Sequence, residues 1–247
     1  MEKLNISVII PVYNEERSIK KVLEAVFSRV EGLHEVIAVD DGSSDRTGAI
    51  CLDFQKEQTK LNYLRLEGNR GKSQALREGI ARSSGDIVII QDADLEYDPA
   101  EINAVVAPIQ EGVADMVLGS RFLVRKASRS LYFRHFMANK FITFLSNLLT
   151  DLNLTDVETC YKAFRGELIR RMIIISHRFG FEIEVVAKMA KLKKRVYEVP
   201  ISYYGRSYEE GKKIGFMDGL MAIFYILKFN LFTSKKNSFR DLTNPGG

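Results

Sequence analysis

Almost continuously apolar runs, separated by segments of helical periodicity, constrain the fold of this 247-residue chain more than any other feature. SVII (7–10), VIAV (36–39) and IVII (87–90) are the clearest of these runs. A strand that is apolar on both faces needs helices above and below its sheet, and such sheets are mostly parallel. We therefore predict an α/β fold with a mostly parallel central sheet flanked by helices.

The alternation predicts the order of the elements. Strands are expected over 6–13, 35–41, 61–67, 86–91, 114–120, 158–165 and 195–204. Helices are expected over 14–30, 42–58, 71–83, 99–112, 136–149, 180–192 and 214–229, with Asn14 as the first N-cap. We expect one domain over 1–232, with a nucleotide-binding half (about 4–120) and an acceptor-binding half (about 121–232). The polar tail, 233–247, is predicted to be disordered.

Composition narrows the class of protein. A net charge of +4 gives no reason to expect nucleic acid as a partner. Cys51 and Cys160 form no metal-binding or redox pair, which favours a reduced, cytoplasmic setting. The first apolar run is short and is followed by Pro11, as in a strand and unlike a signal peptide. The most apolar stretch, 219–227, is too short to span a membrane.

Acidic residues gather where three of the predicted strands end. The segments are PVYNEE (11–16), VDDGSSD (39–45) and QDADLE (91–96). Open parallel sheets bind ligands at the carboxyl ends of their strands, so these segments should meet in one crevice. Ser43 or Ser44 is a candidate cap for the following helix, which leaves Asp40 and Asp41 available for a ribose or a base.

Asp92 and Asp94 lie one residue apart in an extended segment and should point to the same side. Their repulsion can be relieved by a proton on one of them, or by a divalent cation that also binds a substrate diphosphate. A solvated acidic loop is the plain alternative. Asp98 has a different explanation, because it precedes Pro99 and Glu101 as a helix N-cap does.

Several other classes of site are excluded. Gly71-Lys72-Ser73 lacks the first glycine of a P-loop, since position 66 is leucine, and no GxGxxG follows the first strand. Lys72 is left as either a phosphate neighbour or the start of a helix. The three histidines have no metal-ligand spacing, and no GxSxG nucleophile elbow is present.

Seven segments in order carry a resemblance: IPVYNEE, VDDGSSDRT, NRGKSQAL, QDADLEYDP, GSRF, CYKAFR and VPISYYGRSYEEGKKIG. The chain resembles the family 2 glycosyltransferases of the GT-A fold, and among them the dolichol- and polyprenol-phosphate mannose and glucose synthases. The resemblance covers residues 4 to 230. It implies a nucleotide-sugar donor, a polyprenyl or dolichyl phosphate acceptor, and Mg²⁺ or Mn²⁺.

The resemblance also implies roles for single residues. The nucleotide would contact Pro11, Tyr13, Glu15, Val39, Asp41, Asp92 and Ala93. The metal ligands would be Asp92, Asp94 and Glu96, the last at a position where the family often has glutamine. The catalytic set would be Asp94, Arg121, Arg134, Arg206 and Lys212, whose basic members bring the donor and acceptor phosphates together.

Two departures from the family pattern leave the sugar and the acceptor undetermined. Ser73-Gln74 follows Lys72 where the family often has glycine, and the family's GESK is Glu209-Glu210-Gly211-Lys212 here. A soluble acceptor is the first alternative, and it would need a catalytic base such as Asp156 or Glu158. A non-catalytic protein that binds nucleotide sugars is the second.

Two helices raise the question of a membrane. The segments 136–149 and 215–229 are rich in Phe, Leu, Ile and Met, with lysines among them. Such helices lie either in the protein core or in a membrane interface. We expect peripheral attachment at the cytoplasmic face of the membrane, directly or through a membrane partner protein.

Overall fold

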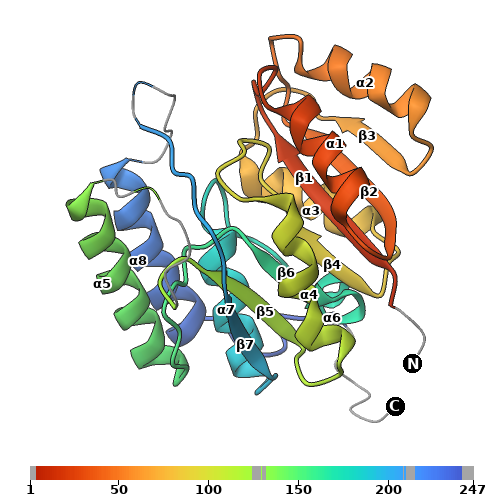
Figure 1. The fold of residues 1–247 in the computed structure, drawn as a ribbon. Helices are drawn as coiled ribbons and strands as arrows, with labels where there is room; N and C mark the ends of the chain where they lie inside the picture. The colour runs from red at the N-terminus through yellow and green to blue at the C-terminus, as the bar shows by residue number, and fades with distance from the viewer. Residues whose placement is uncertain (1–3, 124–128, 130–131, 208, 210–214, 241–247) are drawn as a thin grey trace.

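One sheet carries strands from both halves of the chain (Figure 1). The computed structural model describes residues 4–123, 129, 132–207, 209 and 215–240. In this part of the chain the sheet has seven strands in the order β3-β2-β1-β4-β6-β5-β7. The strands are β1 Ile6–Val12, β2 Leu33–Asp40, β3 Leu61–Arg65, β4 Ile87–Ile90, β5 Met116–Ser120, β6 Lys162–Arg165 and β7 Val196–Pro200.

The helices follow the predicted order, with one addition. They are α1 Ile19–Arg29, α2 Thr47–Glu57, α3 Lys72–Arg82, the 3₁₀ helix η1 Pro99–Glu101, α4 Ile102–Gln110, α5 Phe133–Thr150, α6 Gly166–Arg171, α7 Phe181–Lys191 and α8 Phe216–Leu231. The six-residue α6 was not predicted. It is too short to show a helical apolar period, which is the signal on which the prediction depends.

The sheet is mostly parallel, as the apolar runs predict. β1 pairs in parallel with β2 and β4, β2 with β3, and β5 with β7. Every residue of β4 and β5 is buried, so both faces of these strands are covered. The exception is β6, which lies between β4 and β5 and is antiparallel to both.

The start of α1 differs from the prediction. The helix begins at Ile19 after Ser18, so Asn14 is not its N-cap. Asn14 instead adopts a left-handed backbone (φ 52°) at the end of β1. Its N–H donates to Ser43 Oγ at 3.0 Å, and its Oδ1 accepts from Ser44 N at 2.8 Å. Asn14 thus ties the ends of β1 and β2 together, a role that depends on residues about thirty positions away.

Two other local predictions have opposite outcomes. Asp98 caps η1 as expected, since its Oδ1 accepts from Ala100 N at 2.9 Å. Neither Ser43 nor Ser44 caps α2, whose N-cap position is Arg46; the carboxylate of Asp45 accepts from Thr47 N at 3.0 Å. Ser43 and Ser44 bond to Asn14 instead.

The first part of the tail is ordered, contrary to prediction. Phe239 is buried and forms a β-bridge with Met172, and Ser238 is fully buried. Ile173 N donates to Ser238 O at 2.9 Å, and Arg240 N donates to Arg171 O at 2.8 Å. One apolar side chain and these backbone bonds outweigh the polar composition of the segment. Residues 241–247 lie outside the described part of the chain.

Candidate active site

The predicted acidic segments meet between β1 and β4. β2 and β3 lie on one side of β1, whereas β4, β6, β5 and β7 lie on the other, so the strand order reverses at this point. Open α/β sheets bind ligands at such a reversal, outside the carboxyl ends of the strands. The residues after β1 (Tyr13–Glu15) and after β4 (Asp92–Asp94) occupy this position.

Asp92 is held by a lysine. Lys72, the first residue of α3, places Nζ 2.9 Å from Asp92 Oδ1 and 3.1 Å from Oδ2. The same Nζ lies 3.1 Å from Glu182 Oε1 in α7. Burial works against the lysine charge, yet Asp92 and Glu182 raise the pKa of Lys72 well above its ordinary value. The Lys72 side chain therefore links α3, the end of β4 and α7.

Asp94 has a different environment. Its Oδ1 accepts from Glu96 N at 3.0 Å, and no described residue donates to its Oδ2. Burial raises the pKa of Asp94 to about 7, and the negative charges of Asp92 and Glu96 act in the same direction. A carboxylate that burial and two like charges destabilise is a favourable ligand for a cation, because the cation offsets both effects.

Glu96 bonds to the segment that follows β7. Leu95 has a left-handed backbone (φ 62°), which redirects the chain between Asp94 and Glu96. Glu96 Oε2 accepts from Tyr203 Oη at 2.8 Å, its Oε1 accepts from Arg206 N at 2.8 Å, and its carbonyl accepts from Tyr204 N at 2.9 Å. Both carboxylate oxygens of Glu96 thus hold the segment that follows β7.

The prediction that Asp92, Asp94 and Glu96 share one ion stays a prediction. In the described ranges no three His, Cys, Asp or Glu side chains lie together as a metal site. Tyr203 and Arg206 bond to Glu96, and Lys72 bonds to Asp92. Asp94, with Asp92 beside it, stays as the predicted metal position.

Arg206 joins the two strand ends. Its Nη2 donates to Glu15 Oε2 at 2.9 Å and to Asp94 O at 2.6 Å, while Nε donates to Asp94 O at 3.1 Å. Nη1 lies 3.3 Å from Glu15 Oε1. Glu15 N is itself fixed by Thr47 Oγ1 at 2.9 Å. The guanidinium therefore joins the segments that follow β1 and β4. The predicted contacts of Arg206 with the substrate phosphates and of Glu15 with the nucleotide stay predictions.

The remaining predicted nucleotide contacts have mixed surroundings. Pro11 and Tyr13 are partly exposed at the end of β1, and Asp92 is partly exposed next to the buried Ala93. Val39 is fully buried against Ile37 and Ala75, and its contact with the nucleotide stays a prediction.

The paired acids after β2 have structural partners. Asp40 is fully buried and accepts from Tyr63 Oη and Ser43 N, each at 2.7 Å. Asp41 accepts from Arg70 N at 2.8 Å and from Gly71 N at 2.7 Å, directly before α3. Both acids were expected to lack a structural duty. Asp41 also positions the segment that carries Lys72, and its contact with a nucleoside stays a prediction.

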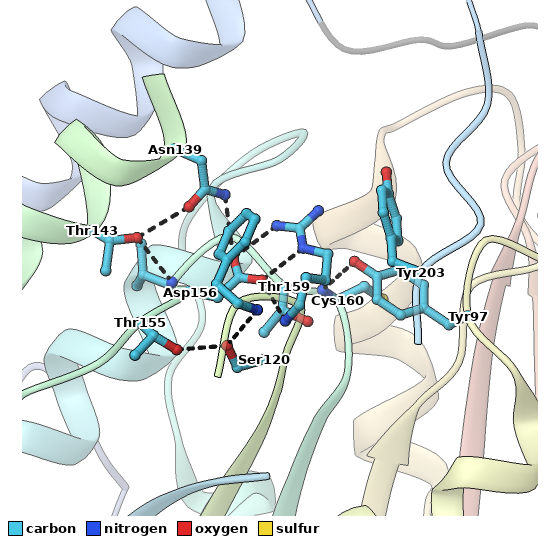
Figure 2. A network of polar contacts seen from close by, with 12 residues as sticks. Tyr97, Ser120, Asn139, Thr143, Thr155, Asp156, Thr159, Cys160 and Tyr203 are labelled. Atoms are coloured by element: carbon cyan, nitrogen blue, oxygen red, sulfur yellow. Dashed lines mark hydrogen bonds and ion pairs between the residues drawn. The ribbon is translucent and has the colours of Figure 1, made fainter. Parts of the chain in front are cut away.

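Arg121 forms a bidentate ion pair with Asp156 (Figure 2). Its Nε lies 2.6 Å from Asp156 Oδ2, and its Nη2 lies 2.7 Å from Oδ1, which also accepts from Asn139 at 3.2 Å. The guanidinium carbon is 5.0 Å from the ring centre of Tyr203. Nη1 has no hydrogen-bond partner among the described residues, which leaves one edge of Arg121 for the predicted phosphate contact.

The two candidate bases differ. Burial would raise the pKa of Asp156, but Arg121 lowers it, so Asp156 is a poor proton acceptor at neutral pH. Glu158 is the reverse case, because burial and the neighbouring Glu182 raise its pKa to about 7. Its Oε1 is buried without a hydrogen-bond partner in the described structure, as is Glu182 Oε2.

One of the predicted basic residues has no polar contact with this constellation. Arg134 is exposed in the first turn of α5 and makes no hydrogen bond or ion pair with another described residue. Lys212 lies outside the described residues. Of the predicted basic residues that are described, Arg206 and Arg121 pair with acids.

Sequence reasoning made no prediction for Glu182 or Tyr203, and it left two alternatives for Lys72, a phosphate neighbour or the start of a helix. Glu182 lies in an apolar helix, GFEIEVV, where a buried acid is the one local hint of a partner. Nothing near Tyr203 in the sequence indicates that its hydroxyl reaches Glu96, which is 107 positions away. Such contacts are visible in the folded chain alone.

The strand order, its reversal at β1 and the acids that follow β1 and β4 are those expected of the GT-A fold. Residues 7–173 match the family described as Glycosyl transferase family 2. The match covers more than half of the chain, so the protein belongs to this family. The resemblance seen in the sequence is thereby confirmed.

One curated relative and several solved structures are similar to the chain. It is 32% identical over 216 residues to an undecaprenyl-phosphate 4-deoxy-4-formamido-L-arabinose transferase of Proteus mirabilis. That match covers 85% of this chain and 64% of the relative's length. It superimposes on glucosyl-3-phosphoglycerate synthase of Mycobacterium tuberculosis in complex with Mn²⁺, UDP and phosphoglyceric acid. That match has a TM-score of 0.72 and 20% identity, and covers 94% of this chain and 80% of the synthase.

A second structure of the same synthase, with Mn²⁺ and UDP-glucose, gives a TM-score of 0.71 at 19% identity. It covers 92% of this chain and 79% of the synthase. At this identity the likeness establishes the fold. The predicted GT-A architecture, a mostly parallel sheet flanked by helices, is confirmed.

Proposed function

We propose that this glycosyltransferase transfers a hexose from a nucleotide sugar, of the GDP-mannose or UDP-glucose type, to a polyprenyl or dolichyl phosphate. The transfer is metal-dependent and inverts the anomeric centre. The observation that carries the proposal is the bridge from Glu15 through Arg206 to Asp94 at the reversal of strand order. The relative that acts on undecaprenyl phosphate supports the class of acceptor.

The site fits a divalent cation at Asp94. Asp94 carries a carboxylate whose ionised form is destabilised by burial and by Asp92, so a cation is favoured there. When bound, Mg²⁺ or Mn²⁺ neutralises charge on the departing nucleoside diphosphate. Related structures of the same fold contain Mn²⁺. Asp94 would be the principal ligand, with Asp92 beside it.

Other residues of the chain would bind the nucleoside, receive the acceptor and supply positive charge. Pro11, Tyr13 and Asp41 border the proposed nucleoside position in the half from about 4 to 120, and the half from about 121 to 232 receives the acceptor. A lipid phosphate is already an anion, so it can attack the anomeric carbon without a general base. Its approach to the donor diphosphate requires positive charge, which Arg121 Nη1 and Arg206 supply. A direct displacement of this kind inverts the anomeric centre.

Replacement of Asp94 tests the proposal. The protein is incubated with Mn²⁺, labelled GDP-mannose or UDP-glucose, and a polyprenyl phosphate, and label that enters the organic phase is counted. Asp94→Asn should lower the rate by at least about a hundredfold, because it removes the charge that holds the cation. The matched control is Asp53→Asn on the exposed face of α2, which should leave the rate unchanged.

Two results would contradict the proposal. One is the absence of organic-soluble label with every donor tested. The other is full activity of Asp94→Asn, which would show that the metal does not depend on this carboxylate. Melting temperatures of both variants, measured beside the assay, separate a loss of chemistry from a loss of fold.

A soluble acceptor is the second candidate, and Glu158 is the observation that favours it. A hydroxyl nucleophile needs a general base, and a base works best when its pKa lies near the operating pH. The pKa of Glu158 is about 7. If the acceptor is a hydroxyl compound, Glu158→Gln should lower kcat by about a hundredfold or more. With a lipid phosphate acceptor, the same variant should retain a kcat within a few-fold of the wild-type value.

The acceptor also determines where the protein works. A polyprenyl phosphate is embedded in a membrane, and nucleotide sugars are substrates in the cytoplasm. We therefore propose peripheral attachment at the cytoplasmic face, directly or through a membrane partner protein. In the described structure no helix is both long and apolar enough to cross a bilayer.

A further inference from the structure

Helices α5 and α8 lie side by side at one end of the molecule and expose an unusual number of large apolar side chains (Figure 1). We call this surface the α5–α8 face. Its members are Phe133, Met137, Phe141, Phe144 and Leu148 of α5, and Met217, Leu220, Met221, Phe224, Leu227 and Leu231 of α8, with Phe232 at its end. Exposed apolar side chains that gather on two neighbouring helices mark a candidate interaction site.

The exposed apolar side chains lie on a different side of each helix from the side chains that pack in the core. Those of α5 recur every three or four residues from Phe133 to Leu148, which is the spacing of a single helical stripe. A separate stripe of α5, with Ile142, Thr143 and Ser146, is buried against the protein. α8 repeats the pattern, because Tyr225, Ile226 and Phe229 are buried on its inner side. Each helix therefore has an inner face for the fold and an outer apolar face without a described partner.

The charges on these helices indicate what the outer face meets. The residues of α5 and α8 include three cations, Arg134, Lys140 and Lys228, but one acid, Asp218. Lys140 Nζ donates to Thr155 O at 3.2 Å within the protein, so Arg134 is the exposed cation of α5. Lys228 Nζ lies about 5.9 Å from the ring centres of Phe224 and Tyr225 and 5.5 Å from that of Phe229, so this cation lies among the aromatic side chains of α8. Exposed Lys235, Lys236 and Arg240 follow α8. Apolar side chains with cations among them complement a bilayer that contains anionic lipids.

We propose that the α5–α8 face docks on the surface of a lipid bilayer with anionic head groups. The proposal rests on the proposed function, since a polyprenyl phosphate must be reached from such a surface. Contacts from α5 lead directly to the acceptor half of the site. Asn139 donates to Asp156, the partner of Arg121, and Lys140 Nζ is 4.4 Å from the ring centre of Phe122. A bilayer on this face would thus be one helix away from Arg121.

Vesicle co-sedimentation tests the proposal. The full chain is mixed with phosphatidylcholine vesicles, with or without about one third phosphatidylglycerol, and the bound fraction is measured. Phe144→Glu/Phe224→Glu places two charges at positions that are 63% and 52% exposed, so the fold should tolerate them. The matched control is Leu52→Glu on α2, which is 50% exposed and lies at the other end of the molecule (Figure 1).

The wild-type protein and Leu52→Glu should bind the mixed vesicles equally. The double variant should bind at least about tenfold more weakly, because each glutamate must be dehydrated at the interface. Unchanged binding of the double variant, with a normal melting curve, would overturn the proposal. So would a wild-type protein that binds no vesicles but forms dimers in solution that the double variant disrupts, since a second copy would then cover the face.

An assay of transfer separates this proposal from the proposed function. With a water-soluble short-chain prenyl phosphate and no vesicles, the double variant should match the wild type. With a long-chain acceptor in vesicles, the variant should lose activity in proportion to its binding. If the wild-type protein binds vesicles through this face but transfers no sugar to any acceptor, the proposed function fails while docking stands.

Discussion

Asp92 and Asp94 are one residue apart, yet the fold gives them opposite surroundings. Lys72 compensates the charge of Asp92 at 2.9 Å, whereas burial raises the pKa of Asp94 to about 7. The difference follows from the side chains that other parts of the chain bring to each carboxylate. The ammonium group of Lys72 bonds to Asp92 and Glu182 and does not bond to Asp94. Asp94 is therefore the carboxylate that we propose for the metal ion.

Lys72→Met should destabilise the protein by about 3 kcal/mol at pH 7, since removal of one partner from a buried ion pair leaves uncompensated charge. Asp92 and Glu182 would then face each other without the ammonium group between them. Chemical denaturation at several pH values measures the loss of stability.

The control is Lys56→Met, which removes an exposed lysine that pairs with Asp53 on α2. This variant should show no measurable change in stability. A Lys72→Met protein as stable as the wild type at every pH would show that the bridge between α3, β4 and α7 contributes nothing to the fold.

Among the elements, the segment 203–206 after β7 decides the shape of the site. Glu96 accepts hydrogen bonds from Tyr203 Oη and Arg206 N, and Arg206 then reaches Glu15 and Asp94. Arg129 adds a further tie, because its N–H donates to Tyr203 O at 3.0 Å. The segment is thus anchored from several directions, and its position depends on the carboxyl group of Glu96.

Glu96→Ala should lower kcat/KM for the nucleotide sugar by about tenfold or more, because two donors lose their partner and Arg206 loses its position. Glu96→Gln should retain most activity, since an amide can accept from Arg206 N and donate to Tyr203 Oη. Steady-state kinetics and a Mn²⁺ titration measure both variants. If Glu96 were a metal ligand, Glu96→Gln would weaken Mn²⁺ binding instead, and the anchoring role would be wrong.

At the scale of the whole molecule, one acid joins three neighbouring strands of the sheet. Asp115, directly before β5, places Oδ1 3.1 Å from Nε of Arg165 in β6 and 2.9 Å from Nη2 of Arg195, which precedes β7. Its Oδ2 accepts from Arg195 N at 2.9 Å. β5 is the middle strand of the three, with the antiparallel β6 on one side and the parallel β7 on the other. Asp115 therefore helps to fix the strand order that creates the site.

The stability that Asp115 provides should depend on pH. Burial would raise its pKa, but hydrogen bonds and charge from Arg195 lower it to about 2. A group with a depressed pKa stabilises the fold above its unfolded pKa, and this contribution is lost as the pH falls from about 4 to about 2. Asp115→Asn should therefore melt below the wild type at pH 7, and the difference should shrink toward pH 2. An equal difference at all pH values would exclude this explanation.

The strands, most helices and the cap at Asp98 could be predicted, because apolar periodicity and capping act between residues close in sequence. The acids at the strand ends could also be placed in one crevice, since parallel strands bring their carboxyl ends to one edge. The misassigned caps at Asn14, Ser43 and Ser44 failed for the opposite reason. Their side chains bond across loops that the folded sheet brings together.

Tertiary structure decided which partner each charged side chain of the site has. Arg206 meets Glu15 across 191 positions, and Lys72 of α3 pairs with Asp92 after β4 and with Glu182 in α7. A charge pair depends on separations of a few ångströms and on burial, and neither quantity can be read from a linear order of residues. The chain order thus indicates which residues gather at the crevice, while the packed sheet decides which of them are free for substrate.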